Sequence, residues 1–209
     1  MSRARFDSAA CDTVAECVKE IERGTDAELV IVVRVRSGRY LHSDYLFGFL
    51  LSLVILLFLL FSRITFHEIW VPIDVVLAFV AGAFICSRSD VLRRLFSTES
   101  YRKQAVRTAA AAMFYEAGIA NTKAERGVLV YLSLLERRLE LIADRGVLKQ
   151  VPSQVWNEKL FELHEIGKKP EPQSFLTAVR DFGKVLAKHV PATGDNPNEL
   201  SDAPRFELK

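Results

Sequence analysis

The stretch Tyr45–Ser62, YLFGFLLSLVILLFLLFS, decides the fold together with a second apolar run at Ile69–Ser87, IWVPIDVVLAFVAGAFICS. Each run is long enough to cross about 30 Å of hydrocarbon as a helix. Only the short polar stretch Arg63–Glu68 separates them, so the two runs predict a transmembrane helical hairpin. The segments on the two sides of a hairpin emerge on the same face of the membrane, which allows them to build one domain together.

Arginines flank the predicted hairpin on its outer sides. They are Arg34, Arg36 and Arg39 before the first run, and Arg88, Arg93 and Arg94 after the second. In the loop, Arg63 is the single Lys or Arg. Because Lys and Arg favour the cytoplasmic side of a membrane, we expect a plasma-membrane protein with two spans, both termini in the cytoplasm and the short loop outside.

Composition places the rest of the chain among soluble domains. About 160 residues lie outside the hairpin, the size of one ordinary domain. The formal net charge is only +2. A nucleic-acid partner usually requires a concentrated basic surface, so we expect none. The three cysteines, Cys11, Cys17 and Cys86, form no CxxC motif, and the first residues lack the apolar core of a signal peptide.

The remaining patterns predict a small α/β domain that the hairpin divides. Residues 1–44 supply a helix over 8–23 and a strand over 29–33, and a strand of such continuous apolar character is usually covered on both faces. The first 44 residues cannot cover it, so we expect residues 88–190 to complete the domain. That segment predicts a helix over 97–117, strands over 127–134 and 138–143, and helices over 153–166 and 173–189; residues 191–209, rich in Pro, Asn and Asp, predict an extended tail.

The segment TDAELVIVV and the later segment AVRTAAAAMFYEAGIANTKAERGVLVYLSLLERRLELIADRGV resemble the TPM domain family. That family includes a thylakoid lumen phosphatase, a photosystem repair protein and a modulator of acetylcholine receptors. Its elements appear here in order: an acid-containing strand, an Ala-rich helix, a Gly-Val-Leu strand, an E-R-x turn and a strand that ends in Gly. The resemblance extends from Ile21 to about Val190 apart from the hairpin. It implies a TPM-like α/β sandwich with a small mixed sheet flanked by helices, in a bacterial membrane-anchored branch, although the usual domain is uninterrupted.

Acidic residues stand at the ends of two predicted strands. Asp26 and Glu28 precede the first strand, and Asp144 ends the third. If these strands are neighbours, the three carboxylates converge at one sheet edge, where oxygen ligands suit Ca²⁺ or Mg²⁺. The alternative, which we favour, is that they are ordinary solvated acids at strand ends.

Two arginines flank glycines near the same ends. Arg126 precedes Gly127, and Arg145 precedes Gly146. Arginine forks bind phosphate well, so both are candidate phosphate-binding residues. The favoured alternative is that they pair with Asp26 or Asp144 and hold the loops.

One further ionisable group, Asp74, stands in the second apolar run. Ionisable groups inside a membrane are often functional. Asp74 lies about one helical turn from the polar loop, which favours an interfacial position. Common nucleotide-binding, serine-hydrolase and zinc-protease motifs are absent from the sequence.

Two functions therefore stay open. The first is a non-enzymatic factor for the assembly, maintenance or regulation of a membrane protein complex, whose partners are the lipid bilayer and another membrane protein. The second is a metal-dependent acid phosphatase that acts on phosphomonoesters at the membrane face. Convergence of the three carboxylates is required by the second function and not by the first.

Overall fold

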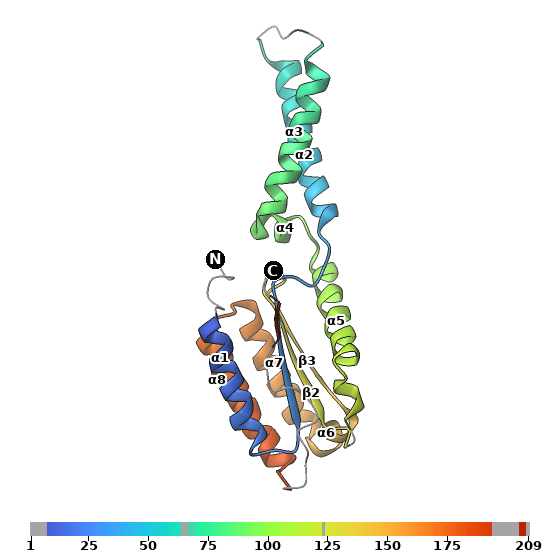
Figure 1. Cartoon of the computed structure of the whole chain (residues 1–209). Helices are drawn as coiled ribbons and strands as arrows, with labels where there is room; N and C mark the ends of the chain where they lie inside the picture. The colour runs from blue at the N-terminus through green and yellow to red at the C-terminus, as the bar shows by residue number, and fades with distance from the viewer. Residues whose placement is uncertain (1–7, 64–66, 68, 123, 194–204, 208–209) are drawn as a thin grey trace. The chain divides into compact units, whose positions relative to one another are not determined.

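The computed structural model describes residues 8–63, 67, 69–122, 124–193 and 205–207. Two compact units divide the chain (Figure 1). The α/β unit combines Met1–Ser37 with Lys103–Lys209, and the hairpin unit, Gly38–Arg102, is inserted between these two segments. One folded unit is thus built from chain on both sides of the insertion.

A mixed four-stranded sheet forms the centre of the α/β unit. Its strands are β1 (Glu28–Arg34), β2 (Gly127–Ser133), β3 (Arg138–Ala143) and β4 (Arg205–Glu207), in the spatial order β3-β2-β1-β4. β1 runs parallel to β2 and to β4, and β2 runs antiparallel to β3. The sheet confirms the predicted fold class, a small mixed sheet flanked by helices and interrupted by a helical hairpin.

The edge strand β4 was not predicted from the sequence. It pairs Arg205 with Val32 and Glu207 with Arg34 of β1, and the Arg34 Nε–H donates to Glu207 Oε2 at 2.5 Å. A strand of three residues shows too little alternation to be predicted from a sequence. β4 forms because it pairs with β1 in the sheet. Residues 194–204 and 208–209 of the expected tail lie outside the described part of the chain.

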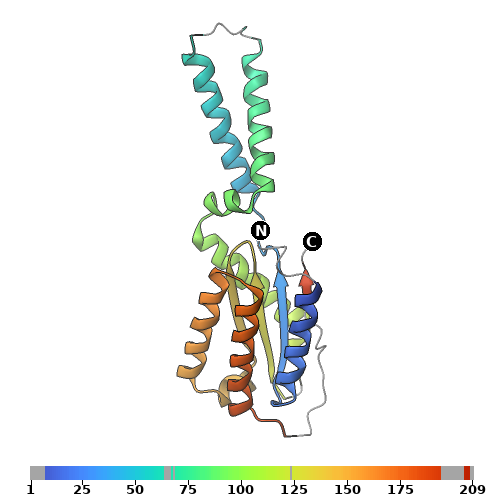
Figure 2. The same ribbon diagram turned by 90° about the vertical axis from the view of Figure 1, so that its left-hand side faces the viewer.

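Three helices cover one face of the sheet. They are α1 (Ser8–Glu22), α7 (Ser153–Lys168) and α8 (Pro172–His189), which lie side by side in front of the strands in Figure 2. Their apolar residues pack on the odd positions of β1 and the even positions of β2 in one cluster, which includes Val18, Ile31, Val130, Leu163, Phe175 and Val179. The core of the unit therefore sits mainly on this face.

A single long helix, α5 (Glu99–Glu116), covers the other face, followed by the 3-10 turn η2 (Ile119–Asn121). Its residues Val106, Ala110, Met113 and Phe114 are buried there against β1 and β2. Small alanines let the helix approach the strands closely. One helix on this face against three on the other leaves the outer side of α5 exposed.

The hairpin unit consists of α2 (Leu41–Phe61), α3 (Val71–Arg88) and the short α4 (Asp90–Leu95). α2 and α3 are both long and apolar enough to cross a membrane, and only 17% and 11% of their apolar windows are buried. A helix in the core of a soluble protein would be mostly covered, and these are not. α2 begins at Leu41, four residues before the predicted start at Tyr45, because a polar first turn continues the helix.

The two apolar helices cross at a pair of glycines. A Cβ on Gly82 would lie 2.9 Å from the Gly48 Cα, and a Cβ on Gly48 would lie 2.6 Å from the Phe79 carbonyl oxygen. Small residues at such positions let two membrane helices approach closely. Each helix supplies only one glycine to this contact, so the close approach requires Gly48 and Gly82 to face each other. The spacing of residues within one helix cannot predict that.

Candidate functional site

The register of the sheet brings two of the predicted acids to the same end of the strands, where β2 begins. Glu28 of β1 pairs with Gly127 of β2, and the Asp144 N–H donates to the Gly127 carbonyl at 2.9 Å, just beyond the last β2–β3 pair. The first and third strands are not neighbours, because β2 lies between β1 and β3. Glu28 and Asp144 flank the strand that starts at Gly127, two strand spacings apart, which is about 10 Å between their backbones.

The side chain of Ile119 fills the space above Gly127. A Cβ on Gly127 would lie 2.3 Å from the Ile119 carbonyl oxygen and 2.6 Å from its Cγ2, and Ile119 is fully buried. An apolar side chain thus stands on the strand between Glu28 and Asp144. Within the ranges that the structure describes, no three His, Cys, Asp or Glu residues gather closely enough to hold a metal ion.

Asp26, the third predicted ligand, has partners of its own. Its carboxylate forms an ion pair with the Arg126 guanidinium and accepts hydrogen bonds from the Thr193 N–H at 2.9 Å and the Thr193 hydroxyl at 2.7 Å. Burial raises the pKa of Asp26, but these hydrogen bonds and the charge of Arg126 outweigh it, and the pKa lies below its ordinary value. The predicted alternative role of Arg126, pairing with Asp26, is the one observed.

This contact belongs to a larger clasp between the end of α8 and the start of β1. The Thr25 hydroxyl donates to the Val190 carbonyl at 2.5 Å, and the Asp26 N–H donates to the same carbonyl at 3.2 Å. Thr25 also bridges to Pro191. Asp26 therefore holds the chain after α8 against the sheet edge, and a metal ion here would require it to leave Arg126. Ca²⁺ or Mg²⁺ at this edge stays a prediction.

Asp144 and Arg145 begin the unpredicted helix α6 (Arg145–Gln150). One carboxylate oxygen of Asp144 accepts from the Arg145 N–H at 2.7 Å, as expected of Asp before a helix. The other, Oδ2, is buried and makes no hydrogen bond to the described residues. The Arg145 residue is exposed, and the ion pair of Asp26 is with Arg126.

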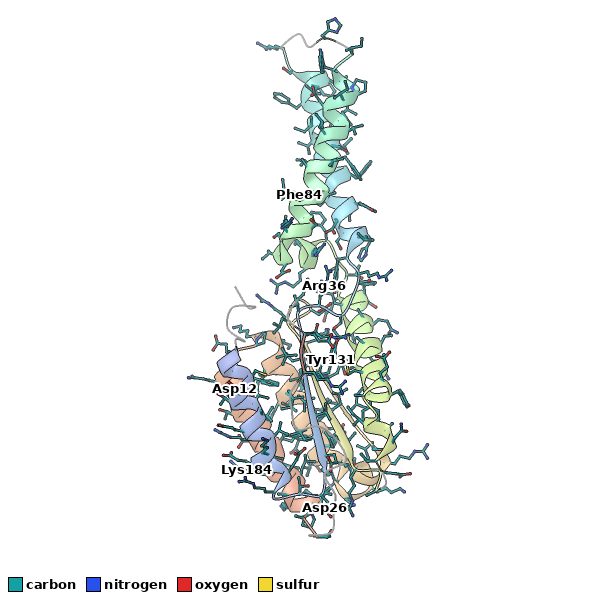
Figure 3. All side chains as sticks on the ribbon, in the orientation of Figure 1. Asp12, Asp26, Arg36, Phe84, Tyr131 and Lys184 are labelled. Atoms are coloured by element: carbon teal, nitrogen blue, oxygen red, sulfur yellow. The ribbon has the colours of Figure 1, made fainter. Side chains whose placement is uncertain are left out.

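Sequence reasoning missed a polar cluster at the opposite end of the sheet. Figure 3 labels Tyr131 near this end and Asp26 at the other. The Ser37 hydroxyl lies 2.9 Å from the Tyr131 hydroxyl and donates to the Ser133 hydroxyl at 2.8 Å. Ser133 in turn donates to Glu136, whose other carboxylate oxygen accepts from the Ser37 N–H at 2.9 Å. Tyr131 and Ser133, two apart on one face of an otherwise apolar strand, were the available signal.

This cluster is closed to solvent. Tyr131 and Ser133 have no exposed surface, and Glu136 has 4%. Burial raises the pKa of the Tyr131 hydroxyl, and the hydrogen bond to Ser37 and the charge of Arg34 offset only part of that rise. The phenol therefore stays protonated at neutral pH, and the hydroxyls bind one another. A substrate has no access to Ser133.

The outer face of α5 carries another feature that suits binding. A shallow hollow of about 460 Å³ lies along it. Its lining residues come from successive turns of this helix: Gln104, Arg107, Thr108, Ala111, Ala112 and Tyr115. Tyr115 is 71% exposed. Tyr and Arg are the residue types that most often anchor protein interfaces, and alanines between them let a second surface come close.

No protein-family model matches the chain, and none of the curated proteins compared with it matches. A solved structure is similar to it. This is the NMR structure of the BA42 protein from the psychrophilic bacterium Bizionia argentinensis sp. nov., which is 14% identical, with a TM-score of 0.58 over 96% of this chain and 94% of that chain. At this identity the likeness supports the fold alone, so the TPM family stays a prediction from the sequence.

Proposed function

We propose that this chain is a membrane-tethered interaction protein of the TPM type, a non-enzymatic factor in the assembly, maintenance or regulation of a membrane protein complex. Its hairpin spans a bacterial plasma membrane, and its α/β unit lies in the cytoplasm. The arginines on the outer sides of the hairpin support this orientation. The lipid bilayer and another membrane protein are its partners.

The pairing of β1 with β2 carries the proposal. The two strands pair over their full length, from Glu28 with Gly127 to Arg34 with Ser133, although the hairpin lies between them in the chain. The central strands of the sheet thus come from opposite sides of the anchor. An enzyme that only needed attachment to a membrane could carry one helix at either end of its domain. Here the hairpin cannot be removed without cutting the chain between the two central strands.

The outer face of α5 is the surface that we assign to the partner. It offers Tyr115 and Arg107 as anchors around small alanines, and the opposite face of the sheet is covered by three helices. The closed cluster around Ser133 and the paired Asp26 support a role other than catalysis. Their polar groups bind each other, and the α5 surface is a feature of the α/β unit that fits a macromolecule.

A photo-reactive amino acid placed at Ala112 tests this assignment. In membranes of the source cells, we expect a crosslink from position 112 to a membrane protein. The matched control is position Glu165 on α7, also exposed, which should give no such product. Tyr115→Ala should reduce the yield at position 112 by about tenfold, the effect of a typical interface anchor. Equal crosslinking at 112 and 165, or none at either, would contradict the assignment.

One observation favours the second candidate, a metal-dependent acid phosphatase. Asp144 Oδ2 is a buried carboxylate oxygen without a hydrogen bond to the described residues, at the edge where Glu28 also lies. We propose Asp26, Glu28 and Asp144 as its ligand set for Ca²⁺ or Mg²⁺ and Arg126 and Arg145 as its phosphate-binding residues. Asp26 and Arg126 would then have to separate from each other.

A metal titration of the detergent-solubilised chain decides whether this candidate stands. A cation that binds only the folded protein stabilises it by about 2.7 kcal/mol at a hundred times its Kd. On the phosphatase hypothesis, Ca²⁺ or Mg²⁺ raises the melting temperature, and Asp144→Asn abolishes the rise. Asp181→Asn, which removes an exposed acid on α8, should leave it intact. A melting temperature that does not respond to either metal excludes the hypothesis.

A further inference from the structure

The short helix α4 exposes an apolar face. Its sequence is DVLRRL, and Val91 and Leu95, one turn apart, are 63% and 73% exposed. Residues four apart share a helix face. α4 follows α3 directly, since Arg88 ends α3 and Ser89 caps α4 by accepting a hydrogen bond from the Leu92 N–H. Figure 2 shows α4 turning aside from the axis of α3 at the base of the hairpin.

The other side of α4 is fixed to the first turn of α2. The Arg93 guanidinium donates two hydrogen bonds to the buried Asp44 carboxylate, at 2.9 and 2.7 Å. The Phe96 ring packs edge-on against Phe47, and the Ser43 hydroxyl donates to the Phe96 carbonyl at 3.1 Å. α4 is therefore rigidly oriented within the hairpin unit, with Val91 and Leu95 held in the open.

Basic side chains surround this base of the hairpin. Arg88 is exposed and places its guanidinium 5.0 Å from the centre of the Phe84 ring, an exposed α3 side chain labelled in Figure 3. Arg39, which is exposed, and Arg94, which is half-buried on α4, belong to the same hairpin unit. Arg93 is neutralised by Asp44. The Arg88 guanidinium thus lies over an apolar ring in a cation–π contact, and arginines at a membrane boundary combine apolar packing with a charge that reaches water.

From these observations we infer that α4 lies in the membrane–water boundary and binds an anionic phospholipid leaflet. Val91 and Leu95 enter the region between headgroups and acyl chains, and Arg88 and Arg94 contact the phosphates. A helix with one apolar face and flanking arginines, fixed at the end of a membrane span, has the chemistry of an interfacial helix. The inference rests on the membrane insertion proposed above and adds the lipid class that the base of the hairpin recognises.

Quenching by brominated lipids tests it on the full chain in vesicles. With Trp70→Phe and Trp156→Phe, the native tryptophans are removed, and single reporters follow from Leu95→Trp, Phe84→Trp and Phe161→Trp. We expect Phe84→Trp to be quenched by brominated phosphatidylcholine and phosphatidylglycerol alike. Leu95→Trp should be quenched more by the phosphatidylglycerol, with a preference of about fivefold for each arginine engaged. Phe161→Trp on α7 should be quenched by neither.

Matched variants isolate the contribution of charge. Arg88→Gln with Arg94→Gln should abolish the preference of Leu95→Trp for the anionic lipid, while Arg63→Gln at the opposite end of the hairpin should preserve it. If Leu95→Trp is quenched no more than Phe161→Trp while Phe84→Trp is quenched, the inference is overturned and membrane insertion stands. Equal quenching of Leu95→Trp by both lipids also overturns it. If Phe84→Trp is not quenched either, the membrane insertion itself is wrong.

Discussion

Asp26→Ala is expected to destabilise the α/β unit by about 3 kcal/mol, the lower end of the cost of breaking a buried ion pair. The side chain of Asp26 is 2% exposed, and its removal leaves the Thr193 N–H and hydroxyl without their acceptor. The cost stays at the lower end because Arg126 keeps 26% of its side-chain surface and can regain water. Denaturation of the detergent-solubilised chain measures it, with Trp70→Phe leaving Trp156, which packs against Phe182, as the reporter.

The same carboxylate predicts how stability depends on pH. Its folded pKa lies below its ordinary value, so the folded state favours the ionised form. The contribution is fully present above the unfolded pKa of about 3.9 and is lost as the pH falls through the lower folded pKa. Asp26→Ala should therefore differ most from the native chain near neutral pH and converge with it in acid.

Asp181→Ala is the matched control for this prediction. Asp181 forms an exposed pair with Lys184 on α8, and exposed pairs contribute little to stability. The control should unfold like the native chain at neutral pH. If Asp26→Ala and Asp181→Ala have the same denaturation midpoint, the clasp between α8 and β1 contributes nothing, and the structural role assigned to Asp26 is wrong.

Gly82→Leu is expected to separate the two helices of the hairpin. A Cβ at Gly82 meets the Gly48 Cα at 2.9 Å and Leu51 side-chain atoms at 3.1 and 3.2 Å, so a leucine needs room that the crossing does not have. Overpacking of this kind costs about 1–3 kcal/mol. The midpoint of SDS denaturation should fall, measured by the fluorescence of Trp70 after Trp156→Phe.

Ala81→Leu provides a control at the next position. Ala81 is exposed on α3, so a larger apolar side chain at this position does not have to displace α2. We expect its denaturation midpoint to equal that of the native hairpin. A fall of the same size in both variants would show that Gly82 is not a contact between α2 and α3.

The sequence predicted the elements whose patterns are long. The strand expected over 29–33 and the helix expected over 97–117 both appear, as β1 and α5, because burial of both faces of the sheet requires long apolar patterns. Short elements were missed. α4, α6 and β4 contain six, six and three residues, too few for a periodicity, and they form because neighbours pair with them or cap them.

The candidate site was predicted less completely, for a different reason. Glu28 and Asp144 lie at the same end of the sheet, but β2 separates their strands, and Ile119 packs on Gly127 between them. The sequence around Ile119 does not indicate that its side chain packs on Gly127. Likewise Ser37 meets Glu136, 99 residues away in the chain. Contacts between residues so far apart in the sequence depend on the assembled fold. Composition and residue spacing do not predict them.

The inserted hairpin also affects the order in which the parts of the sheet fold. β1 leaves the ribosome long before β2, its parallel neighbour, and strand pairing at a separation near 99 residues is entropically slow. The hairpin shortens that distance: the Tyr101 hydroxyl donates to the Arg39 carbonyl at 2.6 Å across 62 residues. Closing this bridge first lowers the entropic cost of joining β1 to β2 by about 1 kcal/mol. Formation of the hairpin thus becomes an early folding step for the α/β unit that it interrupts.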